Sequence, residues 1–527
     1  MNHAFNLDAV SSGLPAAQLI DPLLQAPSHA PLRVVVVAPP GTGKTTVVPP
    51  ALTNRLQNLA RDGKVVVTQP RRMAARAAAR RLAQLSNTTL GQQVGYTVRG
   101  DKKVSPDTKV EFVTTGVLLR RLIGDPEAHG VSAIVLDEVH ERHLDTDLSF
   151  AMVQQLGELR DTDNPLDVVV MSATLEAQFW ADLLQQDNAT PQVLSVEAVT
   201  HPLREQWAPL HGTQRALDAR GVTNNFLNHI ADTVIKTTQH QSDGDLLVFL
   251  PGAREIRRVA QRLRKQFSHH DGVEILELLG STPANEQDYI LRPEPARQRR
   301  RIVLATNVAE SALTVPGVRI VVDAGLDRQS RLDTVRGVAG LVTVGAAKAA
   351  MIQRAGRAAR EAPGLVVRCL SDAEFAARPA HTPPEMRTAD LTQAVLDLAC
   401  WGTADAAGLH LPEPLPSRPY NAAVATLIQL GALQHTDSNT APKITAFGRE
   451  LAKLPVDPRL GRALNDGAEF VGGHLAAEIV ATLASEHRAE GADVGKLVRW
   501  LRSEKPKRWS DDVARLLRAL PEDTRTD

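Results

Sequence analysis

The sequence predicts an α/β protein with two doubly wound parallel sheets in tandem, followed by an α-helical region. Two series of short β-branched runs, separated by helix-like segments and bounded by turn residues, predict the two sheets. The runs are continuously apolar, which is typical of strands buried on both faces of a parallel sheet. After about Pro384 amphipathic helical patterns replace them. A chain of 527 residues is also too long for a single core.

The first series of runs predicts strands at 34–37, 64–69, 109–115, 133–138 and 167–174. The amphipathic segment 73–85 is predicted to be one of the connecting helices. A second series starts after His201-Pro202, with strands expected at 245–252, 273–280, 301–307, 318–325 and 364–371. In the last part of the chain, 390–402 and 421–433 are expected to be helices, and the remainder to Asp527 is alanine- and leucine-rich helix without evident chemistry.

The composition argues against several classes of protein. Lysine plus arginine equals aspartate plus glutamate, 60 against 60, so a polyanionic partner would need a local path of contacts. Aromatic residues make up 3%, which argues against base-stacking platforms. Cys369 and Cys400 are too few for a disulfide framework or a zinc site. Without a leader-like N-terminus or a membrane-length apolar run, we expect a cytoplasmic protein.

The stretch APPGTGKTT, residues 38–46, is typical of a phosphate-binding loop, with Ala38 where the usual pattern has glycine. Gly41 and Gly43 would let backbone N–H groups converge on phosphate oxygens. Lys44 would reach the β- and γ-phosphates, and the Thr45 hydroxyl would take one magnesium position. Alanine suits the leading position if its φ is negative. The alternative is a glycine-rich turn with an exposed lysine, which the preceding run of four valines disfavours.

The prolines that follow this loop carry a prediction of their own. Pro49-Pro50 are expected to stop or kink the next helix after about a turn, because neither can donate a helical hydrogen bond.

A second motif, VLDEVHERH at 135–143, lies at the carboxyl end of a predicted strand, where open α/β sheets bind ligands. Asp137 is expected to hold magnesium through water, and Glu138 to orient and deprotonate an attacking water. Two carboxylates alone are often only a solvated strand end. A phosphate loop upstream and His140-Glu141-Arg142 downstream favour the catalytic interpretation.

A third motif, QRAGRAAR at 353–360, places Gln353, Arg357 and Arg360 at spacings that predict one helical face. A solvated basic face is the alternative for most arginine-rich helices. Here the first domain has a phosphate loop but no evident arginine finger, and such a finger contributes about 10³–10⁵ in rate. That factor corresponds to about 4–7 kcal/mol of barrier. Hydrolysis would then depend on closing the cleft between the two domains.

Together these motifs resemble those of superfamily 2 helicases of the DEAH-box group, and in detail those of bacterial HrpB-type ATP-dependent helicases. The resemblance covers nearly the whole chain in order, through TQPRRMAARAAA (68–79), VGYTVR (94–99), TTGVLLRRL (114–122), SAT (172–174), LLVFLPGAREI (246–256), ATNVAESALTVPGV (305–318), VVDAGLDRQSRLD (321–333), TADLTQAVLDLACWG (388–402), LIQLGAL (427–433) and FGRELAKLPVDPRLGRAL (447–464). The set is specific although its single motifs are not, and a leading alanine in the phosphate loop is ordinary in this family.

The resemblance implies a domain plan. It predicts RecA-like sheet domains at 12–198 and 199–384, a winged-helix domain at 385–455 and a ratchet-like helical bundle at 456–527. A strand-separating β-hairpin is expected between residues 328 and 345. HrpB-type proteins normally continue beyond the bundle, so we expect this chain to be C-terminally short.

The resemblance also implies the site residues. ATP, or another nucleoside triphosphate, and Mg²⁺ would be bound by Ala38, Pro39, Pro40, Gly41, Thr42, Gly43, Lys44, Thr45 and Thr46, with Thr45 and Asp137 serving the metal. Lys44, Asp137, Glu138, Gln353, Arg357 and Arg360 would be catalytic, Gln353 by positioning water and the two arginines by contacting the γ-phosphate. His140, Ser172, Ala173 and Thr174 would couple hydrolysis to domain movement. The nucleic-acid backbone would be held by Arg71, Arg72, Thr115, Gly116, Arg254, Thr306 and Asn307.

Two further features of the sequence qualify this comparison. Ala359 replaces the glycine usual in the third motif, and its methyl group could crowd the closed cleft. The arginines of ARQRRR, 296–301, are expected to form a solvated lead-in to a strand, with a nucleic-acid role as the minority interpretation.

We therefore expect an NTP-hydrolysing RNA helicase or translocase that acts as a monomer on single-stranded or tailed-duplex RNA. A DNA track is the first alternative, and a nucleotide-gated RNA-binding clamp that does not unwind duplexes is the second.

Overall fold

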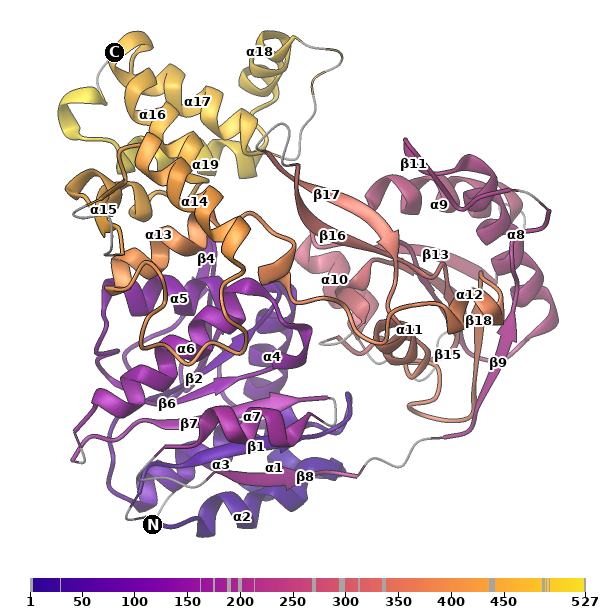
Figure 1. Cartoon of the computed structure of the whole chain (residues 1–527). Helices are drawn as coiled ribbons and strands as arrows, with labels where there is room; N and C mark the ends of the chain where they lie inside the picture. Colours follow the sequence, from indigo (N-terminus) through magenta and orange to yellow (C-terminus); the bar gives the residue numbers. More distant parts are fainter. Residues whose placement is uncertain are drawn as a thin grey trace. The chain divides into compact units, whose positions relative to one another are not determined.

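The computed structural model describes residues 3–28, 30–161, 163–173, 176–186, 191–197, 201–212, 214–267, 272–292, 299–310, 313–333, 338–435, 441–485, 489, 491 and 493–525. The chain divides into two compact units, Met1–Ala389 and Asp390–Asp527. The first unit contains two large parallel sheets and the second is mainly helical (Figure 1). This confirms the predicted fold class.

The first sheet has the strand order β4-β3-β5-β2-β6-β7-β1-β8, and every pair is parallel except β3 with β4. Its strands are β1 (Arg33–Val37), β2 (Lys64–Gln69), β3 (Val94–Val98), β4 (Asp101–Lys103), β5 (Val110–Thr114), β6 (Val131–Leu136), β7 (Asp167–Ser172) and β8 (Gln192–Ser195). All five predicted strands are present. Val34 and Val36 of β1 belong to one core cluster, while the intervening Val35 is also fully buried, as expected for a strand covered on both faces.

Helices precede and connect these strands. They are α1 (Leu7–Ser11), η1 (Pro15–Leu19), α2 (Ile20–Gln25), α3 (Lys44–Asn58), α4 (Arg72–Leu85), α5 (Thr115–Gly124), η2 (Val139–Glu141), α6 (Leu144–Leu159) and α7 (Ala177–Leu184). The expectation that Pro49-Pro50 stop or kink the next helix is wrong as regards a stop, because α3 continues through both prolines. Both rings are buried, and the surrounding helix is buried from Val47 to Leu56, so tertiary packing outweighs the two missing backbone donors.

The second sheet has the order β13-β14-β12-β15-β18-β9 and is parallel throughout. Its strands are β9 (Leu203–Trp207), β12 (Asp245–Phe249), β13 (Val273–Leu278), β14 (Arg300–Ala305), β15 (Val318–Asp323) and β18 (Gly364–Arg368). Its helices are α8 (Asn224–His240), α9 (Ala253–Phe267), α10 (Ala284–Leu291), η3 (Asn307–Ala309), α11 (Lys348–Ala355), α12 (Asp372–Ala376) and η4 (Glu385–Arg387). The five strands predicted here are all present, and β9 is an additional strand at the edge.

Two antiparallel ribbons belong to the same part of the chain. The pair β10 (Leu217–Asp218) and β11 (Gly221–Val222) is short, whereas β16 (Leu326–Asp333) and β17 (Val338–Gly345) pair along their whole lengths. The longer ribbon is visible as two extended arrows in Figure 1 and matches the hairpin expected between residues 328 and 345.

The expectation that the arginines of 296–301 are solvated is wrong for Arg301, the second residue of β14. Arg301 is 1% exposed, and its Nε donates to Asp245 Oδ2 at 2.7 Å. Its Nη1 donates to the Ile290 carbonyl at 2.8 Å. A partly buried carboxylate and carbonyl acceptors compensate the desolvation of the guanidinium, which the local sequence could not indicate. Residues 296–298 lie outside the described part of the chain.

The second unit contains α13 (Thr392–Trp401), α14 (Ser417–Gln429), α15 (Ala446–Lys453), α16 (Pro458–Val471), α17 (Gly473–Leu483), α18 (Val494–Glu504), α19 (Lys507–Ala519) and η5 (Glu522–Thr524). Between α14 and α15, β19 (Leu433–Gln434) and β20 (Lys443–Ile444) form a short antiparallel pair, as in the wing of a winged-helix domain. Over the described residues of both units, no helix has both the length and the apolar character required to cross a bilayer.

Candidate nucleotide site and nucleic-acid interface

The phosphate loop runs from the carboxyl end of β1 to the first residue of α3. Gly41 and Gly43 both adopt φ of 90°, a conformation that favours glycine. A Cβ on Gly43 would also lie 2.8 Å from Leu14 Cδ1, so the N-terminal segment packs against the loop. The Ala16 amide donates to the Thr42 carbonyl at 2.9 Å, which fixes this packing. The N-terminus of α3 therefore follows a rigid, glycine-shaped turn, as anion binding requires.

Ala38 fits this loop without strain. Its φ is not positive, so its backbone is compatible with a methyl group. Its amide donates to the Ser172 carbonyl at 3.0 Å, which ties the start of the loop to the end of β7. The condition that we set on φ at this position is met.

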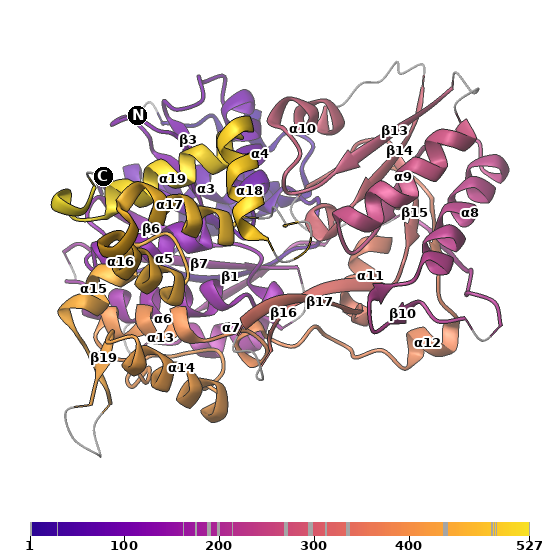
Figure 2. The same cartoon turned by 90° about the horizontal axis from the view of Figure 1, so that it is seen from above.

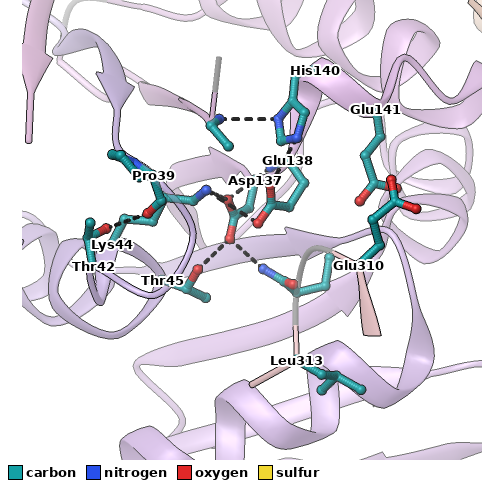
Figure 3. Close-up of polar contacts among 12 residues, drawn as sticks. Pro39, Thr42, Lys44, Thr45, Asp137, Glu138, His140, Glu141, Glu310 and Leu313 are labelled. Atoms are coloured by element: carbon teal, nitrogen blue, oxygen red, sulfur yellow. Dashed lines mark hydrogen bonds and ion pairs between the residues drawn. The ribbon is translucent and has the colours of Figure 1, made fainter. Parts of the chain in front are cut away.

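An acidic pair lies directly beside the loop (Figure 3). Thr45 Oγ1 donates to Asp137 Oδ2 at 2.6 Å, and Lys44 Nζ lies 3.3 Å from Glu138 Oε1. Asp137 follows β6, and Glu138 adopts a left-handed φ of 57°, which is uncommon outside glycine and is found at functional sites. Gln69, at the end of the neighbouring β2, donates to the same Asp137 oxygen at 2.6 Å.

Three polar atoms of this group, Lys44 Nζ, Glu138 Oε2 and His140 Nε2, are buried without a hydrogen-bond partner within the described part of the chain. Their contacts with one another are ion pairs, at 3.3 Å from Lys44 to Glu138 and 3.5 Å from His140 to Glu138. Buried polar atoms in folded proteins are almost always paired, so unsatisfied atoms at one place indicate a site for a ligand. Burial raises the pKa of Asp137 to about 6, although Lys44 opposes the shift. Burial also lowers the pKa of His140 below its usual range.

The residues expected to couple hydrolysis to movement lie next to this pair. His140 Nδ1 accepts a hydrogen bond from the Ala173 amide at 3.2 Å, and its Nε2 lies 3.5 Å from Glu138 Oε2. Ser172 is fully buried at the end of β7. These contacts link the acidic pair to the SAT motif, of which Thr174 lies outside the described residues.

The third motif departs from the expected geometry. Gln353 lies in α11, but this helix ends at Ala355, so Arg357 and Arg360 do not continue its face. The Arg357 amide donates to the Arg354 carbonyl at 3.0 Å, an i→i+3 contact of a tight turn. The prediction that all three side chains share one helical face is therefore wrong, because local turns replace the helix after Gly356.

The two arginines have different surroundings. Arg357 is 4% exposed, and its Nε donates to the Glu310 carbonyl at 2.9 Å while Nη1 donates to the Leu313 carbonyl. Arg360 donates to Thr314 Oγ1 at 2.6 Å, and its Cζ lies 3.3 Å from where a Cβ on Gly41 would be. Burial lowers the pKa of Arg360 to about 10, with Glu138 opposing the shift. Arg360 is thus the arginine that lies against the phosphate loop.

Ala359 causes no backbone strain in this arrangement. Its φ is not positive, and its carbonyl accepts a hydrogen bond from the His201 amide at 3.3 Å. The side chain is 7% exposed. The alanine in place of the usual glycine is accommodated beside Arg360.

Gln353 contributes a further unsatisfied group, since its Nε2 is buried without a hydrogen-bond partner among the described residues. The same region contains Glu310, whose side chain faces Glu141 in Figure 3. Burial raises the pKa of Glu310, and Arg354 opposes the shift. Neither Gln69 nor Glu310 was expected at the site, although both lie within motifs that carried the family resemblance.

The residues expected to hold nucleic acid follow the carboxyl ends of strands. Arg71 and Arg72 follow β2, and Thr115 and Gly116 follow the adjacent β5. In the second sheet, Arg254 follows β12, and Thr306 and Asn307 follow the adjacent β14. Because carboxyl ends of parallel strands lie at one edge, each sheet presents its set at the edge where open α/β sheets bind ligands. In the first sheet that edge also carries the nucleotide loop, after β1, and the acidic pair, after β6.

The loop after the acidic pair is tied to the segment that precedes the second unit. His143 Nε2 lies 2.8 Å from Glu141 Oε2, and its Nδ1 lies 3.4 Å from Glu385 Oε2. The Glu385 amide donates to the Arg142 carbonyl at 3.0 Å. Burial would lower the pKa of His143, but Glu141 and Glu385 together raise it to about 10. Glu141 also pairs with Arg71 at 3.2 Å, so one carboxylate contacts both an expected nucleic-acid residue and this loop.

The donor set is compatible with a hard cation held jointly with phosphate. Among the described residues there is no cluster of three or more histidine, cysteine or acidic side chains that would form an all-protein metal site. Thr45 Oγ1 and Asp137 Oδ2, 2.6 Å apart, are oxygen donors of the kind that Mg²⁺ prefers when substrate phosphates and water complete its shell.

Comparison with known proteins matches this arrangement. Family models for the DEAD/DEAH box helicase, the helicase conserved C-terminal domain and the winged-helix helicase associated domain (HA2) match residues 17–183, 227–362 and 423–456. The chain is 32% identical to the ATP-dependent RNA helicase DHX33 of Drosophila melanogaster, over 92% of this chain and 71% of that protein. The chain belongs to the DEAD/DEAH-box helicase family.

A relative in this helicase family, HrpB of Escherichia coli, matches this chain in sequence and in structure. The ATP-dependent RNA helicase HrpB is 36% identical over 92% of this chain and 56% of that protein, so the chain spans little more than half of its length. The crystal structure of the DEAH/RHA helicase HrpB superimposes with a TM-score of 0.81 at 34% identity, covering 96% of this chain and 60% of that chain. The family resemblance seen in the sequence is thereby confirmed.

Proposed function

We propose that this chain is an ATP-dependent RNA helicase or translocase that couples nucleotide hydrolysis between its two parallel-sheet domains to movement along a single RNA strand. The observation that carries the proposal is the group of buried, unsatisfied polar atoms around the phosphate loop, with Arg360 of the second sheet domain lying against Gly41 of the first. Such a site is complete only when both domains contribute to it. The names of the relatives support RNA as the track.

In the proposed reaction, the loop from Ala38 to Thr46 binds the triphosphate through backbone N–H groups and Lys44. Thr45 and Asp137 would hold Mg²⁺, which when bound neutralises charge on the phosphate oxygens. Glu138 orients a water and accepts its proton while the water oxygen attacks the γ-phosphorus. The bond from that phosphorus to the β–γ bridging oxygen breaks, and ADP leaves.

The second sheet domain supplies the remaining groups. Arg360 stabilises charge on the γ-phosphate, and Gln353 positions the attacking water with its otherwise unpaired amide. His140, through Ala173, transmits the state of the acidic pair to the end of β7. The nucleic-acid residues are mainly small or basic and follow strand ends, which suits contact with sugar and phosphate rather than reading of bases.

The test compares RNA and DNA oligonucleotides as stimulators of ATP hydrolysis, followed by strand displacement on a tailed duplex. Stimulation by RNA above DNA, with displacement, is the expected result. Equal stimulation would refute the preference for RNA. Strong RNA-stimulated hydrolysis without displacement would instead favour a nucleotide-gated clamp that remodels ribonucleoprotein.

A further inference from the structure

A basic groove lies between the helices α8 and α9 of the second sheet domain. These helices run side by side in both Figure 1 and Figure 2. The groove has a volume of about 490 Å³ and is lined by Asn224, Leu227, Arg254, Arg257, Arg258 and Gln261. We call it the α8–α9 groove. Leu227 is its only apolar lining residue among those that the structure describes.

The α9 residues of the groove share one helical face. Arg254, Arg257, Arg258 and Gln261 recur at spacings of three, four and seven residues, which brings side chains together along two turns of a helix. The opposite face of α9 is apolar and buried in the core of the second sheet domain. The helix therefore presents a row of guanidinium groups to the groove, and its position is fixed by packing beneath.

The pairing of charges distinguishes the groove from the rest of α9. Arg262 pairs with Asp232 at 2.5 Å, and Arg264 pairs with Glu277 at 2.8 Å. Arg257 and Arg258 are exposed and have no ion pair with any described acidic residue. The arginines outside the groove are thus neutralised by neighbouring elements, whereas these two keep their charge.

The third arginine connects the groove to the nucleic-acid interface. Arg254 is 61% exposed, and its Nη2 donates to the Val222 carbonyl at 3.2 Å, which holds the side chain beside the groove. It follows β12, at the strand edge where nucleic acid is expected. The first turn of α8, which carries Asn224, also borders the groove, and the N-terminus of a helix favours anions.

We propose that the α8–α9 groove binds the phosphodiester backbone of the RNA strand, as a continuation of the interface at the carboxyl edge of the second sheet. The proposal rests on the proposed function, because it assigns an additional segment of the same track. An anionic strand matches the unpaired guanidinium groups of Arg257 and Arg258, next to Arg254, whose Nε lies 3.5 Å from Glu255 Oε1. A protein partner would be expected to bury an apolar centre, which a groove with one leucine does not offer.

The test is the salt dependence of binding to a fluorescently labelled single-stranded RNA, measured by anisotropy with a non-hydrolysable ATP analogue present. The double variant R257A/R258A is compared with wild type and with R262A/R264A, which removes the same charge from the same helix outside the groove. Each phosphate contact on a single strand contributes about 0.7 to the slope of log K against log salt. Losing two contacts should reduce the slope by about 1.4. Lowering the salt from 1 M to 0.1 M should therefore increase the affinity of wild type about 25-fold more than that of R257A/R258A.

The control variant R262A/R264A should keep the wild-type slope. A wild-type slope in R257A/R258A overturns the proposal, and an acidic protein partner would then be the alternative occupant of the groove. An equal loss in both double variants also overturns it, because the effect would then reflect net charge alone. Thermal unfolding verifies that each variant is folded, and R257Q/R258Q replaces the alanine pair if that pair is unstable.

Failure of this proposal is distinguishable from failure of the proposed function. If wild-type protein neither binds RNA nor hydrolyses ATP faster in its presence, the helicase proposal itself is wrong. If wild-type protein binds RNA and the groove variants bind it with the same salt dependence, the groove proposal is wrong but the helicase proposal is not. A longer RNA gives a second readout, since extending the oligonucleotide should increase the affinity of wild type more than that of R257A/R258A.

Discussion

Arg357 and Arg360 are expected to fail in different ways when each is replaced by alanine. Family resemblance gives both arginines the same role at the γ-phosphate, but the structure gives them different neighbours. Arg357 is buried and donates to two backbone carbonyls, whereas Arg360 is partly exposed and lies against the phosphate loop. Arg357→Ala should therefore lower both stability and turnover, and Arg360→Ala should lower turnover with little effect on stability.

The magnitude follows from the contacts. Without the guanidinium of Arg357, the carbonyls of Glu310 and Leu313 lose their donor, and each buried acceptor left unpaired costs about 1–3 kcal/mol. Removing a desolvated charge recovers part of this, so we expect a net loss of about 2–4 kcal/mol. For a domain of this size that is a decrease in Tm of about 5–15 °C. Arg360 loses one hydrogen bond to Thr314, about 1 kcal/mol, but its absence should slow hydrolysis by about 10³–10⁵.

The assay pairs thermal unfolding with single-turnover hydrolysis in the presence of RNA, for wild type and both variants. Arg357→Lys is a useful companion, because it keeps a charge but cannot donate to both carbonyls in the same geometry. The reasoning would be refuted if Arg360→Ala lowered Tm as much as Arg357→Ala does. Hydrolysis at the wild-type rate by Arg360→Ala would equally refute the role of Arg360 as the finger.

Two further predictions concern the loop that carries the acidic pair. Glu138→Gln should bind nucleotide with unchanged affinity and lose at least about 10³ in turnover, since an amide cannot accept the proton of water; equilibrium binding and hydrolysis rates measured on the same sample check this. Glu141 and Glu385 raise the pKa of His143 from 6.5 to about 10, so the protonated His143 should contribute to the free energy of unfolding. This contribution should be complete below pH 6.5 and should be lost as the pH rises towards 10. The free energy of unfolding measured over that range should decline less steeply in His143→Gln than in wild type.

Much of the fold could be predicted because its evidence is local. A run such as Val34 to Val37 is short, β-branched and continuously apolar, and only a strand covered on both faces suits it. The positions of Thr45 and Asp137 also followed from local rules, because strand order was not needed to place both at carboxyl ends of parallel strands. Their 2.6 Å contact agrees with that inference.

The errors arose where distant residues decide the local structure. The periodicity of 353–360 predicted a continuing helix, but the guanidinium of Arg357 is directed to the carbonyls of Glu310 and Leu313, which no local pattern reveals. Arg301 looked solvated because its partner, Asp245, lies on a neighbouring strand. Pro49-Pro50 were expected to stop or kink a helix, but tertiary packing keeps the helix going through both prolines.

The contact of Glu385 with His143 and Arg142 has a mechanical consequence for the second sheet domain. On its N-terminal side, this domain is preceded by β8, which is hydrogen-bonded to β1 of the first sheet. On its C-terminal side, it is followed by Glu385, which is fastened to the loop after the acidic pair. A relative movement of the two sheet domains would then act on both attachments, and the second attachment includes the loop that follows the acidic pair.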